Sequence, residues 1–426
     1  MVSSQAVTVN EELYPRFAAG PVEAALTDTR VVVINGARQV GKSTLARLVA
    51  HGRSPVEVRF LDDAATRSAA MSDPAAFVRH EGLLVLDEVQ RVPELMLAIK
   101  HDVDLDTRPG RFLLTGSARL LALQSIPDLL PGRSETVEMS PLTQGEIERR
   151  RPTDGSFVNA VFEEGPRLDV PPSRADRDEY LNRALRGGYP EAVRRVDPGR
   201  RARFFDAYVA DLIARDVRQV SEIERPADLR RLLNLLAAQT ATLVTSSAAA
   251  NSLSVPASTV KRYLDLLETV YLVRRIPAWS TNLTNRAVAT PKTIFADSGL
   301  AAHLAGMSLR RTRHPTAPVG PMMETFVLGE LARQLAWTQP AVRLHHYRDR
   351  DDYEVDAVLE HPSGEIVAIE VKAAQTVRSD DFRGIRRLAR RVGGQMVAGI
   401  VLYAGTQSLP FGERLRAWPI STLWNV

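Results

Sequence analysis

More of the fold is specified by one segment than by any other: residues 31–50, which read VVVINGARQVGKSTLARLVA. The apolar run Val31 to Ile34 is typical of a parallel strand that is covered on both faces. The next residues, Gly36 to Ser43, follow the spacing Gly-x4-Gly-Lys-Ser, and a helical stretch from Thr44 to Ala50 comes directly after them. This order of strand, loop and helix predicts an α/β domain with a phosphate-binding loop.

The chemistry of such a loop suits ATP. Its glycines let backbone N–H groups point inward at phosphate oxygens, and the start of the helix adds a positive dipole end. Lys42 is expected to act on the β- and γ-phosphates and Ser43 to ligate Mg²⁺. A glycine-rich turn with a surface lysine is the alternative, which the flanking strand and helix disfavour. The predicted ATP-binding residues are Gly36, Ala37, Arg38, Gln39, Val40, Gly41, Lys42, Ser43 and Thr44.

A second part of an ATPase site follows another apolar run. Leu83 to Leu86 predicts a buried strand, and Asp87 and Glu88 stand at its carboxyl end. We expect Asp87 to hold Mg²⁺ through its water shell and Glu88 to polarise the attacking water. The alternative is that both acids simply open the next helix, where carboxylates are favourable.

Three further residues are candidates near the nucleotide. The strand 111–115 leads to Ser117, which is expected either to sense the γ-phosphate or to cap a helix. Arg133 is the candidate for stabilising charge in the transition state, in its own chain or in a neighbouring subunit, and Arg119 is its nearest rival. An arginine supplied in trans would require a homo-oligomer, which stays open.

The composition narrows the classes of protein. The chain has 426 residues, with 55 Lys and Arg against 51 Asp and Glu, so its net charge of +4 does not by itself indicate nucleic-acid binding. It has no cysteine, which excludes disulfides and thiolate metal sites. We find no apolar run long enough to span a bilayer and no signal peptide, so no membrane partner is expected and the cytoplasm is the expected location.

Lysine is scarce, and its positions are informative. Only five of the 55 basic residues are lysines, and two of them, Lys42 and Lys372, fall in candidate phosphate-handling sites. A general bias towards arginine explains most of the skew. The few lysines that remain can mark sites that need an ammonium, because an ammonium is a compact point charge that the planar guanidinium does not replace.

The length predicts more than one domain. We expect an ATPase domain with a helical extension over residues 1–222, in which the proline- and glycine-rich stretch of about 149–177 is a mobile loop. A second domain is expected over residues 223–309 and a third over residues 310–426.

The middle segment predicts a winged helix. Helices are expected at residues 228–239, 246–253 and 257–269, followed by a strand at 271–276. In a helix-turn-helix, the exposed start of the last helix faces DNA. Contact with a protein is an equally weighted alternative. The candidate DNA-contacting residues are Ser258, Thr259, Lys261 and Arg262.

Carboxylates near the carboxyl terminus predict a metal site. If residues 362–364 form a three-residue hairpin loop with Gly364 in the left-handed conformation, Asp356 lies opposite Glu370. Glu370 and Lys372 then share a face while Val371 packs inward. Asp356 and Glu370 are expected to bind Mg²⁺, and Lys372 to position water or neutralise charge.

The preceding helix is expected to complete this site. Glu324 is the first candidate and Glu330 the alternative. Alternation of charged and apolar residues is also found on solvated hairpin faces with a surface ion pair, and that reading stays open.

Several motifs together resemble those of the prokaryotic AAA-type ATPases that carry a C-terminal domain of uncharacterised function. The resemblance covers nearly the whole chain. The matching motifs, besides residues 36–43 and 83–88, are residues 113–117, Gly187-Gly188-Tyr189-Pro190, Pro291-Lys292, Asp297-Ser298-Gly299-Leu300, residues 324–327, residues 354–356 and residues 369–372.

This resemblance implies a multidomain α/β protein with a P-loop sheet of the additional-strand type, a winged helix and a terminal domain similar to the PD-(D/E)xK nucleases. In those nucleases the matching residues form the metal site, here Glu324, Asp356, Glu370 and Lys372. Two functions follow as hypotheses. One is an ATPase coupled to a nuclease-like domain that acts on DNA, and the other is an ATPase switch whose remaining domains bind DNA or protein without cleavage.

Overall fold

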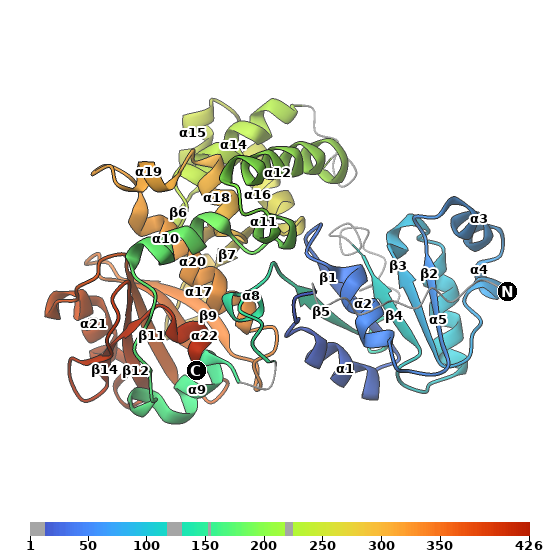
Figure 1. Ribbon diagram of the computed structural model, residues 1–426, viewed down its shortest axis with the longest axis horizontal. Coiled ribbons are helices and arrows are strands. Elements are labelled where there is room, and N and C mark those ends of the chain that lie inside the picture. Colours follow the sequence, from blue (N-terminus) through green and yellow to red (C-terminus); the bar gives the residue numbers. More distant parts are fainter. Residues whose placement is uncertain (1–12, 117–129, 152–154, 218–224) are drawn as a thin grey trace. The chain divides into compact units, whose positions relative to one another are not determined.

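The computed structural model describes residues 13–116, 130–151, 155–217 and 225–426. The chain forms two compact units (Figure 1), the first made of Met1–Leu142 and Glu146–Pro152 and the second of Thr143–Gly145 and Thr153–Val426. The short helix α8 (Gln144–Ile147) carries residues of both units. Within the described part of the chain, no helix has the length and apolar character needed to cross a membrane.

The first unit is built on a five-stranded sheet whose neighbouring strands all pair in parallel. Across the sheet the strands are β2 (Val56–Phe60), β3 (Leu83–Asp87), β4 (Phe112–Thr115), β1 (Val31–Gly36) and β5 (Ser134–Met139). Thus β4 lies between β1 and β3, as expected for a P-loop sheet of the additional-strand type. This arrangement brings the carboxyl ends of β1, β3 and β4 to one edge.

Helices cover both faces of this sheet. On one face α1 (Ala19–Asp28) packs on β1 and β5, and α2 (Lys42–Ala50) packs on β3 and β4. Leu95, Ile99 and Val103 of α5 (Leu95–Leu105) join the apolar core with alternate residues of β1, β3 and β4. Each of these fully buried side chains contributes about 1.5–3 kcal/mol of hydrophobic stabilisation. The remaining elements are α3 (Ala64–Ser72), α4 (Pro74–Phe77) and the 3₁₀ helix Val89–Arg91.

The second unit contains a mixed six-stranded sheet. The strands β9 (Arg343–Arg348), β10 (Glu354–Glu360) and β11 (Ile366–Lys372) form an antiparallel meander. Parallel to β11 run β12 (Met396–Tyr403) and then β14 (Leu415–Pro419), with the short β13 (Leu409–Pro410) at the edge. Apolar residues of α20 (Val319–Gln334) belong to one core of this unit, and those of α21 (Arg383–Val392) belong to another. The strands contribute residues to both cores, in a largely alternating pattern.

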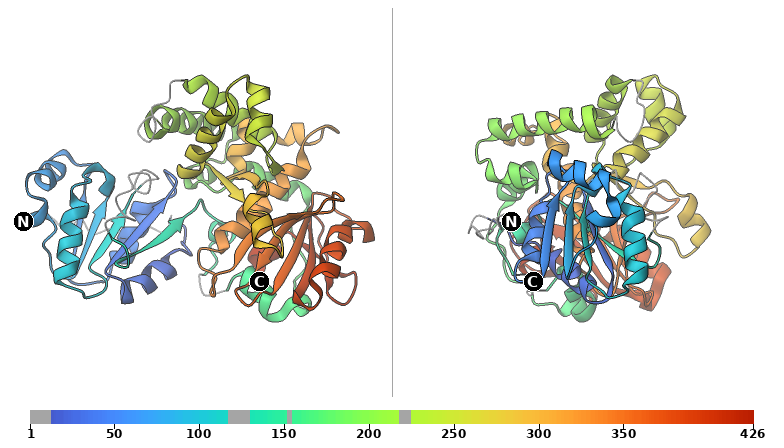
Figure 2. Two further views of the ribbon diagram at one scale, coloured as in Figure 1. Left: turned by 180° about the vertical axis from the view of Figure 1, so that it is seen from behind. Right: turned by 90° about the vertical axis from the view of Figure 1, so that its right-hand side faces the viewer.

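A largely helical region completes this unit. In Figures 1 and 2 its helices gather on one side of the unit and the six-stranded sheet lies on the other. A small sheet in the order β6-β8-β7 belongs to this region. Its elements are α10 (Arg177–Arg186), α11 (Pro190–Arg194), α12 (Pro198–Asp211), the π-helix Leu212–Val217, α14 (Pro226–Ala238), β6 (Thr242–Leu243), α15 (Ser246–Leu253), α16 (Ala257–Thr269), β7 (Val273–Ile276), α17 (Leu283–Val288), β8 (Lys292–Phe295), α18 (Ser298–Leu304) and α19 (Leu309–Thr312).

Two expectations about this region differ from the structure. Residues 178–217, expected as an extension of the ATPase domain, belong to the second unit. The expected mobile loop also contains α9 (Phe157–Glu164), which begins where Ser156 caps the backbone N–H of Asn159. The Phe157 ring lies edge-on to Trp418, with 6.3 Å between ring centroids. The prolines and glycines of this stretch therefore flank a helix that has one buried face.

The motif Gly187-Gly188-Tyr189-Pro190 has a structural role. The buried Asp297 carboxylate accepts the N–H of Gly188 at 2.6 Å and that of Leu300 at 2.9 Å. A Cβ atom at Gly187, whose φ is +71°, would lie 2.2 Å from the Asp297 carboxylate. The motif thus docks the end of α10 onto the start of α18, and its first glycine is required by both backbone conformation and space.

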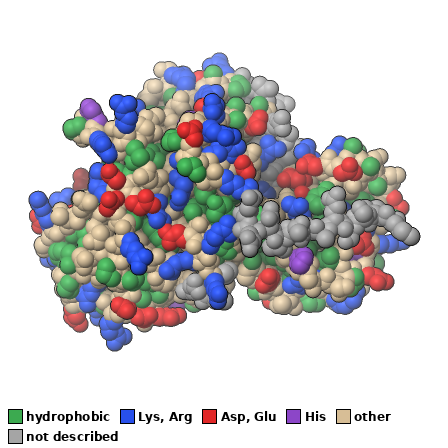
Figure 3. Space-filling model, in the orientation of Figure 1, with side chains coloured by type: hydrophobic (Ala, Val, Ile, Leu, Met, Phe, Trp, Pro, Cys, Tyr) green, Lys and Arg blue, Asp and Glu red, His purple; other side chains and the backbone are tan. Residues whose placement is uncertain are grey.

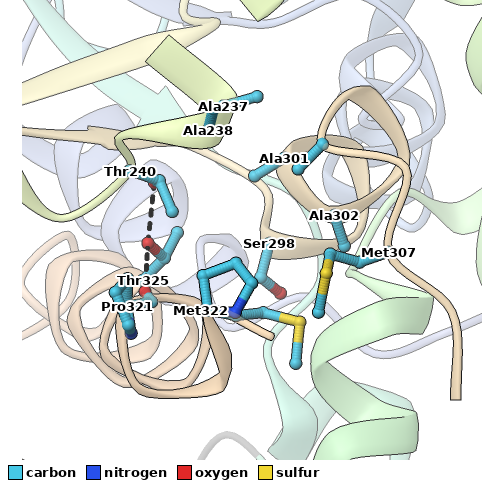
Figure 4. Close-up of a pocket in the computed structure, with 12 residues that line it drawn as sticks. Ala237, Ala238, Thr240, Ser298, Ala301, Ala302, Met307, Pro321, Met322 and Thr325 are labelled. Carbon is cyan, nitrogen blue, oxygen red and sulfur yellow. Dashed lines mark hydrogen bonds between the residues drawn. The ribbon is translucent and has the colours of Figure 1, made fainter. Parts of the chain in front are cut away.

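A small apolar pocket lies between α14, α18 and α20 (Figure 4). The hydroxyls of Thr240 and Thr325 are hydrogen-bonded to each other at 2.8 Å on one of its walls. Met307 and Met322 supply much of the remaining lining. The short helix α22 (Thr422–Asn425) ends the chain, and Leu423 and Trp424 belong to the core of this unit.

Candidate functional site

The phosphate-binding loop has the predicted surroundings, between β1 and α2. A Cβ atom at Gly36, where φ is +146°, would lie 2.1 Å from the Met139 carbonyl oxygen, so no larger residue fits. Gln39 and Gly41 also have positive φ, of 59° and 98°. These left-handed positions curl the backbone immediately before α2, as a cradle for phosphate requires.

Lys42 is buried inside this loop. Its Nζ donates hydrogen bonds to the carbonyl oxygens of Gly36, at 3.0 Å, and Ala37, at 2.8 Å. Both of these acceptors are neutral backbone groups. Exchanging them for phosphate oxygens would give the ammonium negatively charged acceptors, to which its attraction is stronger than to neutral carbonyls.

Arg16 braces the outside of the loop and was missed by motif reasoning. Its guanidinium donates to the carbonyl oxygen of Val40 at 2.5 Å and to that of Ser140 at 2.7 Å. It also contacts the buried Glu146 carboxylate at 3.1 Å. Nothing in the local sequence distinguishes Arg16 from the other arginines, because its partners lie up to 130 residues away.

Thr115 connects the Asp87 carboxylate to the backbone of Glu88 at the end of β3. Its hydroxyl donates to Asp87 Oδ1 at 2.5 Å and accepts the backbone N–H of Glu88 at 3.1 Å. Glu88 has left-handed dihedrals, φ 58° and ψ 45°, which cost a non-glycine residue about 1–3 kcal/mol. The hydroxyl of Thr115 therefore helps to hold Glu88 in a conformation that the chain alone would avoid.

The Glu88 carboxylate is half-buried and accepts a hydrogen bond from the Gln90 amide. Burial raises its pKa above the ordinary value, while the Lys42 ammonium acts in the opposite direction. A carboxylate with a raised pKa is a stronger base than one in water. The sequence analysis gave Thr115 no role of its own. Its position at the carboxyl end of β4, the strand between β1 and β3, is the feature that indicates a site residue.

The other predicted residues near the nucleotide differ in outcome. Ser117 and Arg119 lie outside the described residues. Arg133 directly precedes β5 and pairs with Asp104 at 2.5 Å. Because Val31 is level with Ser134 and Gly36 with Met139, Arg133 lies at the amino ends of the strands, roughly six residues and 20 Å from the start of the loop. A role for Arg133 in the site of its own chain is therefore wrong, and only a role in trans stays a prediction.

The oxygen donors beside the loop suit Mg²⁺. Ser43 is the second residue of α2, and Asp87 ends the neighbouring buried strand. Hydroxyl and carboxylate oxygens are the hard donors that Mg²⁺ prefers, with the remaining positions left to water and phosphate. The residues present therefore fit this ion.

The hairpin of the second unit has the predicted geometry. His361 donates its N–H to the Glu365 carbonyl, and Gly364 has φ +89°, so residues 362–364 form the three-residue loop. The register pairs Ala357 with Ile369, which brings Asp356 next to Glu370. Asp356 Oδ2 accepts the Val371 N–H at 2.8 Å.

The acidic residues here are joined by a lysine that the site prediction had left out. Lys292, the first residue of β8, has a side chain that is 1% exposed. Its Nζ contacts a carboxylate oxygen of Glu324, Glu354 Oε1 at 2.9 Å and Asp356 Oδ1 at 3.3 Å. Burial alone would lower the pKa of Lys292, but Asp356, Glu324 and Glu354 together raise it above its usual range. The ammonium is therefore the cation of this cluster.

Lys372 makes a smaller pair beside it. Its Nζ contacts Glu370 Oε1 at 2.9 Å, and its side chain is 32% exposed. Burial and the neighbouring Asp356 raise the pKa of Glu370 to about 8. Burial and Asp356 also raise the pKa of Glu324 well above its usual range. Near neutral pH the two lysines are therefore surrounded by fewer negative charges than four ionised carboxyl groups would supply.

The predicted metal site is not assembled. Among the residues described, no group of three or more Asp, Glu or His side chains is placed to hold a metal ion. Asp356 has both carboxylate oxygens engaged, one by Lys292 and one by Val371. The alternative Glu330 is buried elsewhere, where it pairs with Arg333 at 2.8 Å. The residues therefore do not fit a divalent ion in this arrangement.

The predicted DNA-contacting residues lie at the start of α16. Ser258, Lys261 and Arg262 are exposed and Thr259 is partly so, while Val260 and Tyr263 are buried. On the face of the second unit seen in Figure 3, Lys and Arg side chains are spread among Asp and Glu side chains. Any preference for an anionic partner would therefore come from local groups of residues.

Comparison with known proteins agrees with the division of the chain. Residues 28–148 match the model of an AAA domain. Residues 177–311 and 319–423 match two domains of unknown function, DUF8612 and DUF4143. The first unit is therefore an ATP-binding domain of the AAA type, and the second contains both of the uncharacterised segments.

An uncharacterized protein of Mycobacterium tuberculosis, Rv2008c, is 31% identical over 405 residues, which cover 95% of this chain and 83% of the relative. The chain belongs to the same family. An uncharacterized protein of Haemophilus influenzae also matches, with 23% identity over 301 residues, 65% of this chain and 69% of the relative.

Solved structures align over much of the chain with low overall similarity. The Walker-type ATPase of Pyrococcus abyssi has a TM-score of 0.41 and 16% identity, over 67% of this chain and 94% of its own. The RuvB branch-migration motor of Thermotoga maritima has a TM-score of 0.29 and 21% identity, over 61% of this chain and 89% of its own.

Proposed function

We propose that the protein is a Mg²⁺-dependent ATPase in which Glu88 activates the attacking water. The observation that carries this proposal is the pair of hydrogen bonds made by the Thr115 hydroxyl, which donates to Asp87 and accepts the backbone N–H of Glu88. They hold the Asp87 carboxylate and the backbone of Glu88 at the sheet edge where the phosphate-binding loop begins, while the Glu88 carboxylate accepts from Gln90. Adjacent carboxylates with separate environments can divide the work between metal and water.

The loop residues Gly36 to Thr44 hold the phosphates in this proposal. Lys42 moves its hydrogen bonds from the carbonyls of Gly36 and Ala37 to phosphate oxygens, where its charge offsets the charge that develops at the γ-phosphate. Mg²⁺, held by Ser43 and through water by Asp87, would neutralise further negative charge on the phosphates when bound.

Glu88 accepts a hydrogen bond from the attacking water and orients it. Its raised pKa makes it a better base, and the Thr115 hydroxyl keeps its backbone in place. Arg16 has a positioning role, because it holds the carbonyl of Val40 from outside the loop.

The test is to separate ATP binding from hydrolysis. Glu88→Gln should bind ATP with a dissociation constant within about threefold of wild type, and its turnover should fall by at least about 100-fold. Glu94→Gln, the same change at an exposed residue just before α5, should behave as wild type. Equal turnover in wild type and Glu88→Gln would exclude Glu88 as the base.

We further propose that residues 223–309 form a winged-helix domain that contacts DNA through α16. The chain order α14, β6, α15, α16, β7, β8 supports this, since it is the order of helices and strands in a winged helix. In this proposal the exposed Lys261 and Arg262 contact phosphates. The nuclease-like domain is proposed over residues 310–426, without cleavage, because its carboxylates do not form a metal site.

DNA binding can be measured by fluorescence anisotropy on a short duplex at two salt concentrations. Lys261→Ala/Arg262→Ala should weaken binding and reduce the slope of log K against log salt by about 2. The matched control is Arg200→Ala/Arg230→Ala, which removes two exposed charges from α12 and α14. Equal loss in both double variants would contradict a specific role for α16.

A further inference from the structure

The cluster around Lys292 joins the two segments of the second unit that match different domain models. Lys292 lies in the segment 177–311, and its partners Glu324, Glu354 and Asp356 lie in the segment 319–423. The ammonium enters from β8 of the small sheet, while the carboxylates belong to α20 and to β10 of the large sheet. One buried charge therefore connects three elements from two parts of the fold.

The contacts leave little for a metal ion to bind. A divalent cation on the carboxylates of Glu324 and Asp356 would have to share them with an ammonium at hydrogen-bonding distance, and like charges repel strongly where water is excluded. The second oxygen of Asp356 is already used by the Val371 N–H. Among the carboxylate oxygens described for this cluster, Glu370 Oε2 is the one that is buried without a hydrogen-bond partner, and one such donor is too few for Mg²⁺.

We propose that Lys292 is a built-in cation that takes the place of a divalent metal in this carboxylate cluster. The cluster is then a structural ionic centre that ties β8 to α20 and β10 without a metal. This inference concerns the second unit and is independent of the ATPase proposal, because none of its residues belongs to the phosphate-binding loop.

Lys372 provides an internal comparison. It is the lysine that the sequence placed in the metal site, yet it is one-third exposed and its ammonium pairs with Glu370. Lys292 is 1% exposed and contacts three carboxylates. If a cation holds the cluster together, Lys292 is the one whose removal should open a site for another cation.

The experiment measures Mn²⁺ binding to the full-length protein without nucleotide, by calorimetry and by the EPR signal of free Mn²⁺. Wild type should show no site that depends on Asp356. Lys292→Met should gain one site per chain, with affinity for Mn²⁺ at least about tenfold above any wild-type binding, because several acidic side chains lose their cation. Lys261→Met, at an exposed position, is the matched control and should gain none.

Thermal unfolding gives a second readout. Lys292→Met should melt at a lower temperature than wild type in EDTA and should recover when Mn²⁺ is added, since binding to the folded state stabilises it. The melting temperature of wild type should not respond to Mn²⁺ through this cluster. Lys292→Met/Asp356→Asn should lose the gained binding and the recovery.

Lys292→Met/Glu324→Gln removes one charge of each sign and serves if the single variant does not fold. It retains Glu354, Asp356 and Glu370, so it should also gain the Mn²⁺ site. Two results would overturn the proposal: Mn²⁺ binding by wild type that disappears in Asp356→Asn, or a folded Lys292 variant that gains no binding.

Discussion

Two buried lysines, one in each unit, show that the same side chain can have two different roles. Lys42 donates to the neutral carbonyls of Gly36 and Ala37 in the phosphate-binding loop. Lys292 contacts the carboxylates of Glu324, Glu354 and Asp356. Both lysines are buried, and the acceptors described for their ammonium groups differ in charge.

This difference decides what each site can accept. The hydrogen bonds described for Lys42 end on neutral carbonyls, so an anionic ligand would offer its ammonium charged acceptors in their place. The charge of Lys292 is matched by acidic side chains of its own chain, so the surrounding site gains nothing by taking up a further cation. A cluster of acidic residues therefore has to be judged together with the cations that reach it from distant parts of the chain.

The largest expected effect is on the stability of the second unit. Lys292→Met leaves buried carboxylates without their cation, and breaking a buried ion pair from one side costs about 3–5 kcal/mol. Chemical denaturation in EDTA measures this change in the free energy of unfolding. Lys261→Met should change it by less than about 0.5 kcal/mol. Equal stability of the two variants would show that the cluster around Lys292 contributes nothing.

The next effect concerns catalysis in the first unit. Lys42→Ala should reduce ATP turnover by at least about 100-fold, because the charge that faces the phosphates is lost. Steady-state phosphate release measures it. Lys100→Ala, at a partly exposed position of α5, should keep wild-type turnover. An unchanged rate for Lys42→Ala would contradict the phosphate-binding role of the loop, and the comparison of Lys42 with Lys292 would then fail.

A smaller effect is expected from Thr115→Val. The variant removes the hydroxyl that bonds Asp87 and the Glu88 N–H, and an unsatisfied buried group costs about 1–3 kcal/mol. We expect kcat to fall about tenfold or more while KM for ATP changes little. Thr136→Val, at an exposed position of β5, is the control. A rise in KM with constant kcat would indicate that Thr115 serves nucleotide binding alone.

The smallest expected effect is on the free energy of unfolding at acidic pH. Burial, followed by the nearby Lys292 ammonium, lowers the pKa of His346 to about 4. The unfolded chain takes up this proton near its ordinary pKa of about 6.5, so the folded state loses about 1 kcal/mol between about pH 6.5 and 5.5. The loss continues until about pH 4, where the folded state is protonated too.

His346→Gln should remove this part of the acid sensitivity, since an amide does not titrate and can still donate to the Thr290 carbonyl. Free energies of unfolding at pH 6.5 and 5.5, compared with those of the exposed His101→Gln, measure it. An identical pH dependence in both variants would contradict a neutral, buried His346.

The sequence predicted local structure well where motif and periodicity agree. The segment 31–50, the acids after β3, three helices of the middle region and the hairpin around Gly364 are present as predicted. Each depends on neighbours within a few residues, or on a turn that fixes its own register. The helix α9 was missed because glycine and proline around it were read as a mobile loop.

Residues whose partners are far away in the chain could not be predicted in the same way. Lys292 and Asp356 are 64 residues apart, and Arg16 and Glu146 are 130 apart. Arg133 was a candidate for the site of its own chain or of a neighbouring subunit, but the strand register puts it at the opposite edge of the sheet. The motif around Gly187 entered the prediction only through the family resemblance, and the structure shows that its backbone binds Asp297.

The burial of the last helix has a consequence for synthesis on the ribosome. Tyr180 accepts the Ser421 N–H across 241 residues, and its ring lies 6.2 Å from that of Trp424. At about 5–20 residues per second, roughly 10–50 s separate the emergence of these two partners. The first unit can finish folding long before, while α10 exposes an apolar face throughout this interval. Nascent and prematurely terminated chains should therefore depend on chaperones mainly through their second unit.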